Sequence, residues 1–203
     1  MTEIKTERLM LTPLGQDYLD KELPIIGLKR GTVQIVPHQE AWAPAAEKII
    51  AQLKGIFGTA ALDIQHIGST AIAGIQAKPI LDIAVGTASL EGLEPVLAQL
   101  EAAGFQKAHN RFSNNLLYII QSEDNIRTCQ VHILVYDSLQ WHNYVDFRDY
   151  MNAFPEKARE YEALKARLAQ ECGNVQTAYT DGKHDYMERV LEEAKQWTDE
   201  KRK

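Results

Sequence analysis

Residues 66–86 read HIGSTAIAGIQAKPILDIAVG, and the organisation of the chain can be worked out from this stretch. A Gly-Ser-Thr turn at 68–70 is followed by a loop of small residues, then Lys78, Pro79 and an apolar run typical of a strand. Asp82 lies inside that run. Acids are rarely buried unless they have a partner, so two interpretations are open. In the first interpretation, Asp82 belongs to a nucleotide-handling site. In the second, Asp82 is a structural aspartate that accepts backbone hydrogen bonds.

Apolar and alternating segments on both sides of this stretch predict the strands of a sheet. Two segments between them have helical periodicity, residues 38–58, which end at Gly55 and Gly58, and residues 89–104, with Ser89 as N-cap and Gly104 as the stop. Pro95 falls inside the second segment, where it removes a backbone donor. The mixture of strands and helices predicts an α/β (α+β) fold. The predicted strands are residues 32–36, 61–68, 79–86, 105–108, 115–121 and 128–136.

The chain changes character at about residue 138 and becomes helical. Three helices are predicted, over residues 138–154, 155–173 and 184–197, and Pro155 is well placed to open the second. The domain prediction is an N-terminal arm over residues 1–31 and one mixed-sheet domain over residues 32–203, whose C-terminal part is helical. The apolar stripe of the second helix is Ala158, Tyr161, Leu164, Leu168 and Cys172.

Composition narrows the function classes. The 203 residues are 45% hydrophobic and 25% charged, with a net charge of −6, so nucleic acid is not an expected partner. No apolar run approaches the roughly 20 residues that span a bilayer, and the opening MTEIKTERLM is too charged for a signal peptide. The two cysteines have no metal spacing. A cytoplasmic protein without membrane partners is expected, and its oligomeric state is not predicted.

The Gly-Ser-Thr turn has the composition of a phosphate-binding turn. If it opens a short helix, its unpaired backbone N–H groups attract anions. Gly68 lets the backbone approach closely, the hydroxyls of Ser69 and Thr70 donate to phosphate oxygens, and Lys78 neutralises charge. The alternative for Lys78 is a solvated or structural lysine, and for His66 a core histidine. The predicted ligand-binding set is His66, Gly68, Ser69, Thr70 and Lys78.

Five segments of the chain carry a family resemblance: VPHQEAW, IQHIGSTAIAGIQAKPILDIAVG, RTCQVHILV, WHNYVDFRDYMNAFPEKAREYEALKARLA and AYTDGKHDYMERVL. Through them the chain resembles the GrpB family, an uncharacterised branch of the nucleotidyltransferase superfamily, over residues 32–195. The resemblance implies a nucleotidyltransferase-like mixed sheet with flanking helices, a nucleotide or phosphorylated small molecule as ligand, an NTP as substrate, and Mg²⁺ or Mn²⁺ as cofactor. Some family members are joined to dephospho-coenzyme A kinase, which points to nucleotide or cofactor metabolism.

The sequence lacks some of the acidic residues that the superfamily uses to bind metal ions. Two-metal chemistry needs two or three carboxylates, but Asp82 is followed by Ile83 and Ala84, and alanine cannot bind a metal. His132 holds the place of the third acid on the later strand. Asp82 and His132 are therefore the predicted catalytic and metal-binding pair, which suits Mn²⁺ or Zn²⁺ better than Mg²⁺. Two functions remain: transfer of a nucleotidyl group, or a catalytically degenerate binding or interaction module on the same fold.

Overall fold

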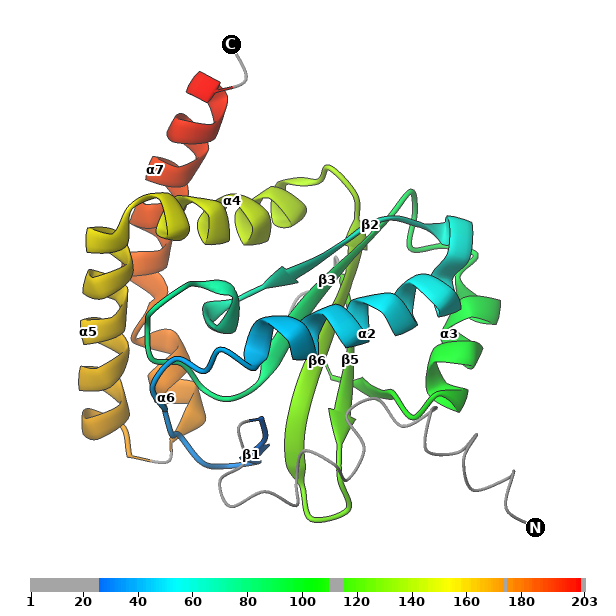
Figure 1. Cartoon of the computed structure of the whole chain (residues 1–203), viewed down its shortest axis with the longest axis horizontal. Coiled ribbons are helices and arrows are strands. Elements are labelled where there is room, and N and C mark those ends of the chain that lie inside the picture. Colours follow the sequence, from blue (N-terminus) through cyan, green and yellow to red (C-terminus); the bar gives the residue numbers. More distant parts are fainter. Residues whose placement is uncertain (1–25, 110–114, 174, 202–203) are drawn as a thin grey trace.

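The computed structural model describes residues 26–109, 115–173 and 175–201, and a six-stranded sheet forms their centre (Figure 1). The strand order is β2-β3-β6-β5-β4, and β1 pairs with β6 off this path. β3 and β6 run parallel, while the other neighbours are antiparallel. The strands are β1 (Leu28–Lys29), β2 (Ala61–Ile67), β3 (Leu81–Thr87), β4 (Gln106–Ala108), β5 (Asn115–Gln121) and β6 (Ile126–Val135).

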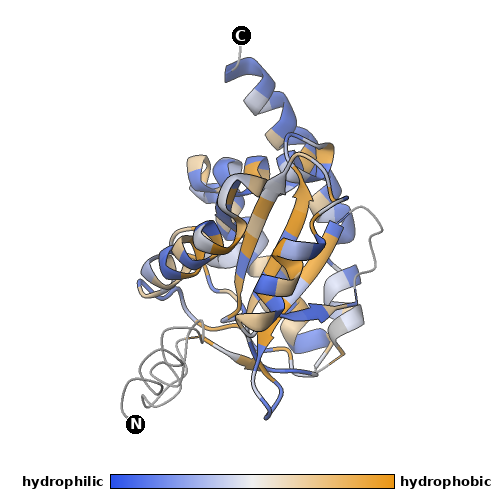
Figure 2. Ribbon diagram, turned by 90° about the vertical axis from the view of Figure 1, so that its right-hand side faces the viewer, coloured by the Kyte–Doolittle hydropathy of each residue, from blue (hydrophilic) through white to orange (hydrophobic). Residues whose placement is uncertain are grey.

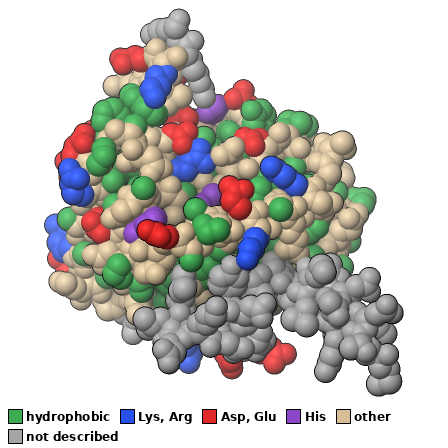
Figure 3. All heavy atoms as spheres, in the orientation of Figure 1, with side chains coloured by type: hydrophobic (Ala, Val, Ile, Leu, Met, Phe, Trp, Pro, Cys, Tyr) green, Lys and Arg blue, Asp and Glu red, His purple; other side chains and the backbone are tan. Residues whose placement is uncertain are grey.

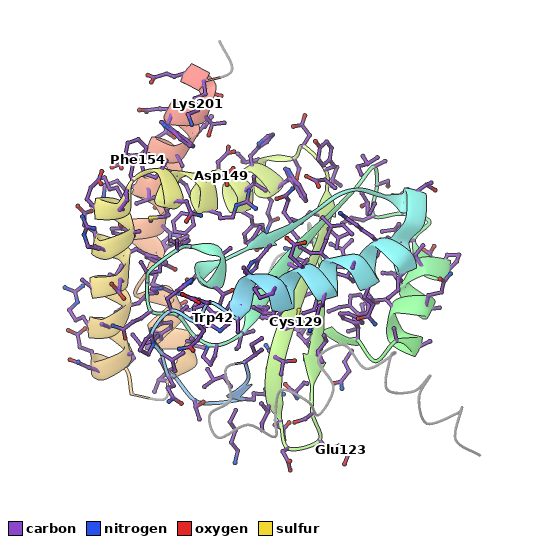
Figure 4. All side chains as sticks on the ribbon, viewed as in Figure 1. Trp42, Glu123, Cys129, Asp149, Phe154 and Lys201 are labelled. Atoms are coloured by element: carbon purple, nitrogen blue, oxygen red, sulfur yellow. The ribbon has the colours of Figure 1, made fainter. Side chains whose placement is uncertain are left out.

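One face of the sheet is covered by α2 (Trp42–Phe57) and α3 (Glu94–Ala102) (Figures 1 and 2). The main core lies here, because the odd-numbered side chains of β3 and β6 meet the apolar stripe of α2. Trp42 and Cys129, both 0% exposed, belong to this core, whereas Glu123, Asp149 and Lys201 lie at the periphery (Figure 4). This layer anchors the central strands that carry Asp82 and His132.

The C-terminal helices pack on the opposite face and on one another. α4 (Leu139–Ala153) places Trp141 against Ala84 of β3, and a second core joins α4, α5 (Pro155–Glu171) and α7 (His184–Lys201) to Ile72 and Ile75. The short α6 (Gln176–Asp181) connects α5 to α7. The mixed α/β fold with flanking helices and a helical C-terminal region is thus confirmed. Ile72 and Ile75 tie the loop after the Gly-Ser-Thr turn to these helices.

Some predicted boundaries are wrong, each for a physical reason. Residues 32–36 form only one bridge, between Val36 and Ala77, because Pro37 has no N–H to continue a ladder. Ser89 does not cap a helix; its hydroxyl accepts from the backbone N–H of Glu91. α3 begins at Glu94, which places Pro95 in the first turn, where no donor is needed.

Residues 1–25 of the predicted N-terminal arm lie outside the described residues. The rest of that arm contains β1, which pairs with β6. Across the described ranges, every helix is too short or too polar to cross a membrane.

Candidate functional site

The register of the sheet places the predicted acid beside the predicted histidine. Asp82 of β3 is aligned with Gln130 of β6, and Ala84 is aligned with His132. Because side chains alternate along a strand, these four residues share one face of the sheet, the face on which α4 packs. The alanine predicted to replace a metal ligand therefore lies directly between the strand acid and α4, and it is fully buried.

Asp82 is held by polar neighbours rather than by apolar core. Its Oδ1 accepts from Gln130 Nε2 at 3.1 Å and lies 3.4 Å from His132 Nε2. The other ring nitrogen of His132, Nδ1, lies 3.5 Å from the Tyr144 hydroxyl of α4. Burial, reinforced by the charge of Asp82, raises the pKa of Tyr144 to about 12, so Tyr144 stays neutral. The Asp82 side chain is 24% exposed, and it is accessible to a ligand.

The Gly-Ser-Thr turn lies directly against Asp82. Gly68 has a φ of 73° and a ψ of −172°, a conformation almost restricted to glycine. A Cβ at this position would lie 2.6 Å from Asp82 Oδ2. The following residues form only η3, a three-residue 3₁₀ turn over Ser69–Ala71. The short helix expected after Gly68 is present only as this single 3₁₀ turn, which is too short to contribute a helix dipole to anion binding.

His66 and Thr70 contact each other beside the turn, and Thr70 also lines one cavity together with Asp82. His66 neighbours the residue aligned with Asp82 and thus points to the α2 face. Its Nε2 lies 2.9 Å from the Thr70 hydroxyl, and burial lowers the pKa of His66 to about 4. Thr70 is only 3% exposed. His66 is therefore neutral near pH 7, and the pair supports the turn from behind.

Three lysines surround a cavity of about 200 Å³ on the other side of the turn, which we call the lysine recess. Lys78 from the loop before β3, Lys165 from α5 and Lys183 from the α6–α7 junction line it, together with Ser69 and Asp82. Lys78 Nζ lies 3.9 Å and Lys183 Nζ 4.7 Å from the ring centre of Tyr179. Tyr179 is buried, at 1% exposed. Its ring therefore makes cation–π contacts with two of the ammonium groups from a fixed position.

Lys165 is the most buried of these lysines, at 2% exposed. It donates to the backbone carbonyl of Gln76, and its Nζ lies 4.6 Å from the Tyr161 ring centre. One turn earlier on α5, Glu162 accepts from the backbone N–H of Gln76 at 2.7 Å. α5 thus holds both backbone polar groups of one loop residue, Gln76. This clamp fixes the loop that leads from the Gly-Ser-Thr turn to Lys78.

The lysines repel one another in a partly desolvated site. Burial, and then the charge of Lys183, lower the pKa of Lys78 to about 8 and that of Lys165 to about 7. Asp82 opposes the shift at Lys78, and Glu162 opposes it at Lys165. A bound anion would relieve the repulsion and favour the charged lysines. The recess is therefore chemically suited to a multiply charged anion.

Two larger cavities adjoin the recess at Asp82 and Lys183. The apolar chamber, about 500 Å³, lies between α4, α5 and α7. The outer cavity, about 790 Å³, reaches His132 and the start of α7. Gly68, Asp82, Tyr144, Tyr161, Lys183 and Met187 line both. Asp82 therefore lines the lysine recess, the apolar chamber and the outer cavity.

Several of these residues were not foreseen from the sequence. Gln130, Tyr179 and Lys183 lie in segments that carry the family resemblance, but nothing in their sequence assigned them a role, because only the fold brings them to Asp82. Lys165 did carry a signal: it lies four residues after Tyr161 and three before Leu168, inside the apolar stripe of its helix. A lysine on an apolar stripe needs a buried partner, and Gln76 supplies it.

The metal predicted from the resemblance can be tested against these donors. Within the described ranges, no group of three or more His, Cys, Asp or Glu side chains is placed to hold a metal ion. The candidate metal ligands that remain are the carboxylate of Asp82 and the imidazole of His132, because the side chain of Ala84 has no donor atom. This donor set does not fit a two-metal centre. Single-metal binding by Asp82 and His132 stays a prediction.

The fold and the site define a mixed α/β protein with one acid on its central strand, a glycine-serine turn against that acid, and a cluster of lysines beside both. The sequence model of the GrpB protein family matches residues 32–193, and the chain belongs to this family. It is 34% identical over 173 residues to the glutamate-rich protein GrpB of Alkalihalophilus pseudofirmus, which covers 83% of this chain and 99% of that protein.

One solved structure is of a member of the same family, and two further comparisons are more distant. The crystal structure of the conserved protein GrpB from Enterococcus faecalis has a TM-score of 0.73 and 28% identity, over 81% of this chain and 99% of that one. A cytoplasmic RNA terminal U-transferase has a TM-score of only 0.44 at 17% identity, over 64% of this chain and 39% of that one. A dephospho-CoA kinase of Mycolicibacterium paratuberculosis is 26% identical over 85% of this chain and 48% of its own length.

Proposed function

We propose that this protein binds a nucleotide or another phosphorylated small molecule and holds its phosphate groups in the lysine recess. The observation that carries the proposal is the convergence of Lys78, Lys165 and Lys183 on one cavity in a chain of net charge −6. Lysines brought together at one cavity repel one another, and a bound anion would offset this repulsion and favour their charged forms. Phosphate oxygens are suitable ligands for lysine, which acts as a compact point charge.

The neighbours of the recess suit the same ligand. Ser69 lines the recess, and its hydroxyl lies 3.5 Å from the Tyr161 hydroxyl. Gly68 presents bare backbone next to the acid. In this proposal the turn contributes hydroxyl groups and close approach of the backbone, while the positive charge comes from the lysines and not from a helix terminus.

Transfer of a nucleotidyl group from an NTP is the finer hypothesis that the resemblance suggests. It requires metal ions on both sides of the reacting phosphorus, or a metal and a base. Asp82 and His132 are the only predicted ligands, and Asp82 Oδ1 is already engaged by Gln130. We therefore propose binding, rather than transfer, as the function, with Asp82 and His132 available for one Mn²⁺ that a phosphorylated ligand would help to hold.

A thermal-shift comparison of matched lysine variants tests this proposal. Pyrophosphate, in EDTA, should raise the melting temperature of the parent, because a ligand at 100 times its Kd adds about 2.7 kcal/mol of stability. Lys183→Met should lose this rise. Lys195→Met, at an exposed position on α7, should keep it. An equal rise in both variants would place the anion elsewhere, and no rise in the parent would refute the proposal.

The same assay with adenosine triphosphate measures what the nucleoside adds. A larger rise than with pyrophosphate would favour a nucleotide, and an equal rise would favour a smaller phosphorylated ligand.

A further inference from the structure

We propose that Lys78 is a reactive amine, which forms an imine with small aldehydes that carry a phosphate group. This covalent site rests on the proposed function, because Lys165 and Lys183 would hold the phosphate while the aldehyde meets Lys78. A lysine that forms an imine needs access for the carbonyl group, an uncharged nitrogen and a means of holding the aldehyde in place. The lysine recess meets each of these needs.

The Lys78 amine is within reach of a molecule in the recess. Its side chain is half-buried and lines that cavity. Its Nζ lies 3.9 Å from the ring centre of Tyr179, and within the ranges that the structure describes no carboxylate or carbonyl oxygen is hydrogen-bonded to it. Lys165 differs on both counts, because it is 2% exposed and donates to the backbone carbonyl of Gln76. Lys78 can therefore react where Lys165 cannot.

The surroundings of Lys78 favour its uncharged form. Burial, and then the charge of Lys183, lower the pKa of Lys78 to about 8, although Asp82 opposes the shift. About a tenth of the Lys78 amines are then uncharged at pH 7, against fewer than about one in a thousand for a lysine with the ordinary pKa of 10.5. Desolvation and a neighbouring cation both activate lysine nucleophiles in this way.

The rest of the recess selects aldehydes that carry a phosphate. Lys165 and Lys183 line the same cavity as Lys78, so a phosphate held by them brings its own aldehyde to Lys78 at a high effective concentration. The recess measures about 200 Å³, which suits a phosphate with a short carbon chain. The ligand class is therefore a compact phosphorylated aldehyde.

The reaction needs neither an oxidant nor a reductant. The lone pair of Lys78 Nζ attacks the carbonyl carbon, and a proton moves from nitrogen to the carbonyl oxygen through water. The second nitrogen proton then leaves with the hydroxyl group as water, and C=N replaces C=O. A bound phosphate raises the pKa of the free amine, but it also stabilises the protonated imine. That imine keeps its positive charge beside the Tyr179 ring, so the adduct is favoured.

Cyanoborohydride reduction followed by peptide mass spectrometry of the full chain locates the imine. Glycolaldehyde phosphate should modify Lys78 about tenfold more than the exposed Lys195. Methoxyacetaldehyde, in which a methyl ether replaces the phosphate ester, should show a clearly smaller preference for Lys78. Pyrophosphate should protect Lys78 and leave Lys195 unprotected. Lys183→Met should reduce the modification of Lys78 by glycolaldehyde phosphate.

The results separate the reactive amine from phosphate binding itself. Equal modification of Lys78 and Lys195, a main adduct on Lys165 or Lys183, or the same preference for Lys78 with both aldehydes would overturn the proposal. A thermal rise with pyrophosphate would leave the proposed function standing in each of these cases. The absence of that rise would refute the proposed function, and the selection of phosphorylated aldehydes with it.

Discussion

Gly68 and Asp82 show how single residues constrain this site. The glycine has a φ of 73° and lies so close to the acid that a methyl group would fall 2.6 Å from its Oδ2. The sequence predicted the close approach of backbone at Gly68 from its place in the turn. It could not predict that the carboxylate of Asp82 is what the backbone approaches, because that contact depends on the pairing of β2 with β3.

Gly68→Ala should therefore destabilise the protein by about 1–3 kcal/mol, through backbone strain and overpacking. Gly74→Ala is the matched control, since Gly74 also has a positive φ, 75°, but has open space where the Cβ would be. Urea unfolding of both variants measures the difference. If Gly74→Ala costs as much as Gly68→Ala, the contact with Asp82 is not tight.

At the scale of elements, α5 positions the loop between the turn and β3. Glu162 and Lys165 bind the backbone N–H and the backbone carbonyl of Gln76, and Lys165 also lines the recess. The periodicity of α5 predicted the helix, and its apolar stripe predicted the packed face. The clamp escaped prediction because it joins residues 89 positions apart. In the same way α6 was missed, as its six residues are too few to show a period.

The stability of the clamp should depend on pH. The folded pKa of Lys165 is about 7 against an ordinary value of 10.5, so between these values the unfolded chain binds more protons and stability rises with pH. Relative to Lys165→Met, the parent should gain about 2 kcal/mol in its free energy of unfolding from pH 7 to pH 9. Lys195→Met, at an exposed position, should show no such trend. A difference between the parent and Lys165→Met that is constant over this range would mean that Lys165 is not desolvated.

At the scale of the whole molecule, the negative net charge of the chain gives no indication of the positive charge at the lysine recess. On the face shown in Figure 3, acidic and basic side chains are interspersed. The net charge of −6 correctly argued against a broad basic surface, but it gave no sign that lysines from a loop, α5 and the α6–α7 junction would converge. Composition averages over the chain, whereas the local field depends on which residues the fold brings together.

The central claim is that lysines, and not a metal, hold the phosphate groups. Calorimetric titration of pyrophosphate into the parent and into Asp82→Asn, both in EDTA, tests it most directly. If the lysines hold the anion, Asp82→Asn should bind at least as tightly as the parent, because the substitution removes a negative charge beside the ligand. Binding that needs added Mn²⁺ and disappears in Asp82→Asn would show instead that a metal on Asp82 holds the phosphate, and would contradict this account.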